Sequence, residues 1–224
     1  MNAGASRIVA AFHRAARVPR EALYGSAQDT QLPQSLHADA RLPFLGFCGS
    51  GYREGGAVFL AINPGGGGDT YAARTPQDSA LLPLIERFRD STISAAPLPF
   101  ERMCESYLAQ AQTWNLWRIL GPAVAACSAR PESLCYLNCF PYRTRGDALP
   151  SAQALKLSWE NVVSPLVATL KPSLLVVLGK KAGNVVTRLY AGDAPPFVVP
   201  RTIGDSYISP AAHEVLSAIR ARVT

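Results

Sequence analysis

Two asparagines closely follow or end apolar runs of the chain and could carry chemistry. Asn63 comes directly after the run 57–62, and Asn138 lies near the end of the run 134–139. A side-chain amide offers both donors and acceptors, so Asn63 could position a water molecule and Asn138 could recognise the edge of a pyrimidine. Neither amide can act as a strong base. The alternative for each asparagine is a local turn cap.

Three polar turns follow the apolar runs, over residues 63–69, 138–145 and 179–183. Four consecutive glycines in the first turn would let the backbone approach a ligand closely. However, the lysine and hydroxyl residue of a Walker A phosphate loop do not follow them, and no GxGxxG follows any run. The sequence therefore disfavours a nucleotide-cofactor enzyme, and a merely flexible turn is the alternative.

Basic residues in two of these turns could contact phosphates; they are Arg143, Arg145, Lys180 and Lys181. The formal net charge is +6, and from Arg143 onward ten Lys/Arg stand against five Asp/Glu. A basic C-terminal half suits a polyanionic partner such as nucleic acid. The alternative for these side chains is an ordinary solvated surface.

The apolar pattern predicts the elements that must position these residues. Near-continuous apolar runs at 57–62, 134–139 and 174–178, with a weaker one at 196–199, indicate strands buried on both faces. Helices are expected at 81–88, 100–108, 116–126, 152–170 (kinked or broken at Pro165) and after Ser209-Pro210. The pattern predicts a three-layer α/β/α sandwich with a central, mostly parallel four-stranded sheet. Ligands gather beyond the carboxyl ends of parallel strands, so the polar turns should meet there.

Length and composition predict a single domain spanning residues 1–224, with 1–43 as an N-terminal arm or cap. An amphipathic helix is expected in this arm; its apolar face would hold Ile8, Val9, Phe12 and Ala16. No apolar run could span a bilayer and no secretory signal is apparent, so we expect a soluble, cytoplasmic protein. The five scattered cysteines are expected to be buried, reduced thiols, with no metal and no cofactor.

Short motifs resemble those of the uracil-DNA glycosylase superfamily. Ala61-Ile-Asn-Pro-Gly65 is similar to its first motif, especially in the mismatch-specific and single-strand-selective branches, and Leu137-Asn-Cys-Phe-Pro141 is similar to its second strand motif. The segments 157–160 and 174–179 resemble the helix and strand that follow, so the similarity spans about residues 55–190. The resemblance implies a monomeric, cofactor-free enzyme that hydrolyses the N-glycosidic bond of uracil or another damaged base in DNA. The base would first be flipped out of the stack into a pocket.

The resemblance also implies roles for individual residues. Asn63 would orient water and Asn138 would bind the uracil edge, while backbone amides near Ile62 and Gly65 would stabilise charge on the departing base. Gly65 stands where strict uracil enzymes carry a tyrosine, which implies a pocket tolerant of modified pyrimidines. Two aromatic residues could stack on the base, with core packing as the alternative: Tyr71 and Phe47.

The sequence departs from the superfamily in its final motif, a His-Pro-Ser-type loop, which is absent. The corresponding region is 199–206, and the chain contains only His13, His37 and His213. Arg201, within this region, could supply positive charge in place of the missing histidine and is a further candidate for contact with DNA. This departure leaves two alternatives open: a catalytically weak or inactive nucleic-acid-binding relative, and a hydrolase of free nucleosides or nucleotides.

Overall fold

A computed structural model describes residues 3–25, 42–65, 76–144, 148–201 and 208–223. A five-stranded sheet with the order β1-β3-β2-β4-β5 forms its centre. The strands are β1 (Gly46–Cys48), β2 (Ala57–Ala61), β3 (Cys135–Asn138), β4 (Leu174–Leu178) and β5 (Pro196–Val199). β2 pairs in parallel with β3 and β4, and β4 with β5, whereas β1 pairs antiparallel with β3. The fold is α/β with a mixed sheet.

The four predicted strands are confirmed, but the prediction of a four-stranded sheet is wrong, because β1 adds a fifth strand at the β3 edge. This strand has only three residues and begins with glycine, so it carries no apolar run that periodicity could detect. Gly46 has φ 118°, and a Cβ there would lie 1.9 Å from the backbone oxygen of Tyr136. Only glycine allows this close approach of the two strands.

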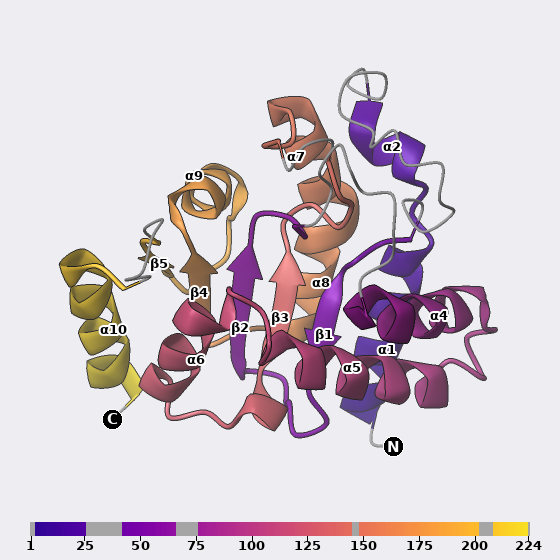
Figure 1. Ribbon diagram of the computed structural model, residues 1–224, viewed down its shortest axis with the longest axis horizontal. Helices are drawn as coiled ribbons and strands as arrows, with labels where there is room; N and C mark the ends of the chain where they lie inside the picture. The colour runs from indigo at the N-terminus through magenta and orange to yellow at the C-terminus, as the bar shows by residue number, and fades with distance from the viewer. Residues whose placement is uncertain (1–2, 26–41, 66–75, 145–147, 202–207, 224) are drawn as a thin grey trace.

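Helices lie on both sides of the sheet, with α5 (Pro97–Ala111) and α6 (Trp117–Ala126) in front of it and α8 (Ser164–Leu170) behind it (Figure 1). The remaining helices are α1 (Ala3–Ala16), α2 (Arg20–Tyr24), α4 (Pro76–Asp90), α7 (Ala152–Ser158), α9 (Lys180–Leu189) and α10 (Pro210–Val223). The helices predicted at 81–88, 100–108 and 116–126 correspond to α4, α5 and α6, and α10 begins at the predicted Ser209-Pro210 pair. None of the described helices has the length and apolarity needed to cross a membrane.

The predicted helix 152–170 is present but is not uniform. A π-helical turn (Trp159–Val163) joins α7 to α8, and the N–H of Ser164 bonds to the carbonyl of Trp159. Pro165 lies in the first turn of α8, and because it has no N–H it cannot bond to a carbonyl in the preceding turn. The expected disruption at Pro165 therefore takes the form of a widened helical turn.

The segment 179–183, predicted as a turn, is the start of helix α9, so that prediction is wrong. Gly179 precedes the helix with φ 96°, and Lys180 and Lys181 are exposed in its first turn. Gly183 packs against β5, where a Cβ would lie 2.5 Å from a valine side chain. Residues 179–183 include two lysines and two glycines, and this composition is typical of a turn. The amphipathic pattern of α9 becomes apparent only after these residues.

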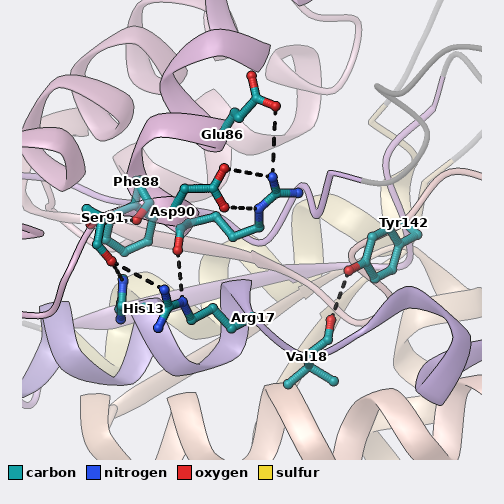
Figure 2. Close-up of polar contacts among 9 residues, drawn as sticks. His13, Arg17, Val18, Glu86, Phe88, Asp90, Ser91 and Tyr142 are labelled. Carbon is teal, nitrogen blue, oxygen red and sulfur yellow. Dashed lines mark hydrogen bonds and ion pairs between the residues drawn. The ribbon is translucent and has the colours of Figure 1, made fainter.

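Helix α1 is held to the end of α4 by polar contacts (Figure 2). Nε2 of His13 lies 2.8 Å from the carbonyl oxygen of Ser91, and Nε of Arg17 donates to the carbonyl oxygen of Arg89 at 2.9 Å. Basic side chains suit these positions because the last carbonyls of a helix lack partners within it. The apolar face of α1 is buried, as predicted for Ile8, Val9, Phe12 and Ala16. The described part of the predicted arm therefore packs on the core.

The five cysteines are all buried and form no disulfide. Three of them gather where β1, β3 and α5 meet; these are Cys48, Cys104 and Cys135. Burial raises the pKa of the Cys127 and Cys139 thiols to about 12. These thiols are therefore protonated at neutral pH and pack as small apolar groups, as expected.

Candidate functional site

A cavity of about 550 Å³ lies at the carboxyl ends of the parallel strands. The end of β2 and the turn after it, Ala61–Gly65, form one wall, and Asn138, Leu178 and Arg201 line it at the ends of β3, β4 and β5. Side chains from α4, from α5 and from the segments before β1 and after α5 also line it. Both predicted asparagines, Asn63 and Asn138, thus line the same cavity. A larger cavity of about 700 Å³ between α1, α5 and the segment after β1 holds none of the predicted site residues.

Asn63 is half-buried, and a threonine from another loop fixes its amide. Nδ2 of Asn63 donates to Oγ1 of Thr144 at 3.3 Å, and the Thr144 hydroxyl donates its own proton to the carbonyl oxygen of Ala148 at 2.5 Å. Because the hydroxyl proton is used, Oγ1 can only accept from Asn63, which sets the orientation of the amide. Within the described ranges Oδ1 of Asn63 has no protein partner. This oxygen can therefore accept a hydrogen bond from a water molecule or ligand.

Asn138 is buried and ties β1 to β3. Its Nδ2 donates to the carbonyl oxygen of Phe44 at 2.7 Å, and its Oδ1 accepts from the hydroxyl of Tyr136 at 3.0 Å. Burial raises the pKa of Tyr136 well above its usual value, so this hydroxyl remains a donor. An amide has two N–H groups and an oxygen with two lone pairs. Asn138 therefore keeps one donor and one acceptor site beyond these contacts.

Arg143 forms a buried ion pair with Asp78, which sequence reasoning missed. The guanidinium donates to the two carboxylate oxygens of Asp78 at 2.8 and 3.2 Å, and its Nε donates to the carbonyl oxygen of Gly65 at 2.8 Å. These contacts hold the turn that carries Asn63 against the start of α4. Arg143 thus lines the cavity with its charge paired to Asp78 and is not the solvated surface side chain offered as the alternative; its contact with phosphate stays a prediction.

Phe44, rather than Phe47, is the phenylalanine of the cavity wall. Phe47 is fully buried between the rings of Tyr107 and Tyr136, with centroids 6.1 and 5.8 Å away, so core packing accounts for it. The guanidinium of Arg143 lies over the ring of Phe44, 4.6 Å from its centroid. Phe44 could not be identified from the sequence because β1, which it precedes, was not predicted.

Helix α5 and the segment after it supply polar and aromatic groups that the sequence did not indicate. Tyr107, Gln110, Trp114 and Asn115 line the cavity. The indole of Trp114 packs edge-on against the Tyr107 ring at 6.1 Å. An aromatic and amide-rich wall suits a planar, polar ligand.

The remaining predicted site residues lie partly at the cavity and partly away from it. Lys180 and Lys181 are exposed at the start of α9, beside the end of β4, and they do not line the cavity. Ile62 and Gly65 line it, and a Cβ built on Gly65 would meet no described atom within 4 Å. Tyr71 and Arg145 lie outside the described residues.

No histidine of the described ranges lines this cavity. His13 binds the carbonyl of Ser91, and His213 is exposed on α10, while His37 lies outside the described residues. Arg201 does line the cavity, and its charge partly offsets the effect of burial on the pKa of Tyr136.

The described cavity wall therefore offers amides, hydroxyls, four aromatic rings and the guanidinium groups of Arg143 and Arg201. Its one carboxylate within the described ranges, that of Asp78, is neutralised by Arg143. Such a wall suits an uncharged heterocycle such as a nucleobase. No family model matches the chain, and the search of curated proteins gives no match either.

Proposed function

We propose that the chain is a DNA glycosylase, which hydrolyses the N-glycosidic bond of uracil or another damaged base on a uracil-DNA glycosylase-like, three-layer α/β/α fold. One observation carries this proposal: Asn63 and Asn138 line a single cavity at the carboxyl ends of the adjacent parallel strands β2 and β3. The motif resemblance assigns the same two residues to the reaction. The absence of a strong free base on the described wall suits a reaction whose sugar cation reacts readily with water.

In this proposal the flipped base enters the cavity beside Phe44. The unused N–H of Asn138 donates to a carbonyl oxygen of the base, and the unused lone pair accepts from the neighbouring ring N–H. Uracil carries this carbonyl and N–H side by side, at O4 and N3. The contacts of Asn138 with Phe44 and Tyr136 hold the amide in place before the base arrives.

Water attack is assigned to Asn63. Its free Oδ1 accepts a hydrogen bond from a water molecule and holds that water near C1′ of the sugar. The bond from C1′ to the base breaks with its electron pair moving to the base, and the water oxygen bonds to C1′. The water's proton passes to bulk solvent, and the departing base anion takes up a proton from solvent, so the products are the free base and the abasic sugar. The negative charge on the departing base is stabilised by Asn138, by backbone amides near Ile62 and Gly65, and by the charge of Arg201.

Lys180 and Lys181 are the proposed contacts to the DNA backbone, together with Arg201. The two lysines are exposed at the amino end of α9, where the helix dipole adds to their positive charge. Phosphate contacts would position the DNA without reading its sequence.

An oligonucleotide assay tests the proposed activity. Single- and double-stranded oligonucleotides containing one uracil are incubated with the protein, and abasic sites are revealed by strand cleavage in alkali. We expect cleavage by the wild-type protein and a rate at least about 100-fold lower for Asn63→Ala. Asn184→Ala, which changes an exposed asparagine of α9 outside the cavity, should keep the wild-type rate. Equal rates for Asn63→Ala and the wild type would refute the assignment.

A catalytically silent nucleic-acid-binding protein is the second candidate, favoured by the lack of a histidine on the described cavity wall. It predicts salt-dependent binding of oligonucleotides without release of base. Turnover of free nucleosides in the absence of DNA cleavage would instead support a nucleoside hydrolase.

A further inference from the structure

Two cysteines lie opposite each other where β1 pairs with β3: Cys48 is the register partner of Cys135. The backbone N–H of Gly49 bonds to the carbonyl oxygen of Leu134 at 2.9 Å, so the next pair along the ladder is hydrogen-bonded. Hydrogen-bonded and non-hydrogen-bonded pairs alternate along antiparallel strands. Cys48 and Cys135 are therefore a non-hydrogen-bonded pair, the kind in which the Cα atoms approach to about 4.5 Å.

The contacts of the two thiols agree with this pairing. The backbone N–H of Cys48 does not bond to β3 but donates to Sγ of Cys104 on α5 at 3.4 Å. The side chains of an opposed pair lie on the same face of the sheet, and the thiol of Cys135 hydrogen-bonds with that of Cys48. A disulfide needs Cα atoms about 4.4–6.8 Å apart. The strand pairing already meets this requirement.

The larger cavity gives a small reagent access to one thiol of the pair. Cys48 lines this cavity of about 700 Å³ and is 6% exposed, whereas Cys135 is fully buried behind it. Cys104 also lines the cavity. Burial raises the pKa of Cys104 and of Cys135 well above the usual value, so neither readily forms the reactive thiolate. Cys48 is therefore the thiol expected to react first, with Cys135 next to it.

We propose that Cys48 and Cys135 form a redox-modification site, at which hydrogen peroxide entering the larger cavity converts the two thiols into a cross-strand disulfide. The Cys48 thiolate attacks one peroxide oxygen, the O–O bond breaks, and the other oxygen leaves as water, which gives a sulfenic acid. The sulfur of Cys135 attacks the sulfenic sulfur, the S–O bond breaks, and a second water leaves. The thiol protons depart in the two waters, so two thiols are oxidised and one peroxide is reduced.

The disulfide would tie the short edge strand β1 to β3 and close a long loop that contains β2, α4, α5 and α6. A cross-link across a long loop restricts the unfolded chain and so stabilises the fold. We expect the melting temperature to rise by about 5–10 °C on oxidation. This inference does not depend on the proposed function.

Mass spectrometry of the full chain tests the site. The folded protein is treated with an approximately tenfold excess of hydrogen peroxide, free thiols are alkylated in denaturant, and a tryptic digest is analysed without reduction. Trypsin places Cys48, Cys104 and Cys135 on three different peptides, the last of which also holds Cys127 and Cys139. We expect the peptide of Cys48 to be linked to that of Cys135, and dithiothreitol to separate them.

Variants identify the partner of Cys48. Cys135→Ala should abolish the link and leave a sulfenic acid on Cys48 that dimedone labels. Cys104→Ala should keep the link, although its sulfur lies beside Cys48. Cys127→Ala and Cys139→Ala should also keep it, which assigns the link to Cys135 by elimination even where Cys135→Ala does not fold.

Three results would overturn the inference. Both thiols could remain open to alkylation after peroxide treatment of the folded protein. The link could form only when peroxide is added in urea, which would show that the native pairing does not favour it. The linked form could melt no higher than the reduced form, which would show that the bond distorts the strand pair.

Discussion

Replacement of Arg143 by methionine is expected to lower the free energy of unfolding by about 3–5 kcal/mol. The side chains of Arg143 and Asp78 are only 10% and 4% exposed, so solvent screens their pair weakly. Both carboxylate oxygens accept from the guanidinium, at 2.8 and 3.2 Å. The variant leaves the charge of Asp78 buried without this cation. The cost of that buried charge, rather than the attraction within the pair, sets the magnitude.

An exposed pair of the same chemistry provides the control. Arg89 donates to both carboxylate oxygens of Asp90, at 2.7 and 2.9 Å, but these side chains are 27% and 59% exposed. Arg89→Met should therefore cost only about 0–1 kcal/mol. The double variant Asp78→Leu/Arg143→Met should be more stable than the sum of its single changes predicts, because it buries no unmatched charge.

Urea denaturation followed by circular dichroism measures these differences as shifts in midpoint at constant slope. A loss for Arg143→Met of less than about 1 kcal/mol, or a loss equal to that of Arg89→Met, would contradict the burial argument. The burial argument would also be contradicted if the stability losses of the single changes Asp78→Leu and Arg143→Met added up to the loss of the double variant.

Two other predictions address the site. Thr144→Val removes the hydroxyl that orients Asn63. It should lower the cleavage rate about tenfold with little change in KM, and it should reduce the free energy of unfolding by about 1–2 kcal/mol. An unchanged cleavage rate would argue against the positioning role of Thr144. The double change of Lys180 and Lys181 to glutamine should weaken DNA binding and reduce the slope of log K against log salt by about 2, whereas Lys171→Gln, at the opposite end of β4, should leave the slope unchanged.

The larger features of the fold could be predicted because strands buried on both faces are continuous apolar runs. The runs at 57–62, 134–139, 174–178 and 196–199 all became parallel strands. Parallel strands end at the same edge, which brought the two asparagines into one cavity. Strand β1 was not predicted for two reasons. Its pairing depends on a glycine that fits against the neighbouring backbone, and three residues are too few to show an alternating pattern of apolar and polar side chains.

The finer features of the cavity depend on partners that are distant in sequence. Arg143 looked like a surface cation because nothing nearby in the chain indicates that Asp78 meets it. Tyr107 and Gln110 sit within an ordinary helical pattern, and only the packing of α5 shows that their polar atoms are buried without partners. Sequence periodicity reports which face of a helix is apolar, but not which polar group on that face lacks a partner.

The reversed direction of β1 bears on when the cavity can form during synthesis. Its amino end and the carboxyl end of β5 lie at the same edge, so the first and last strands both contribute to one pocket, through Phe44 and Arg201. A nascent polypeptide can pair β1, β2 and β3 well before β5 leaves the ribosome. The cavity wall is therefore completed late, only when the final strand docks beside β4.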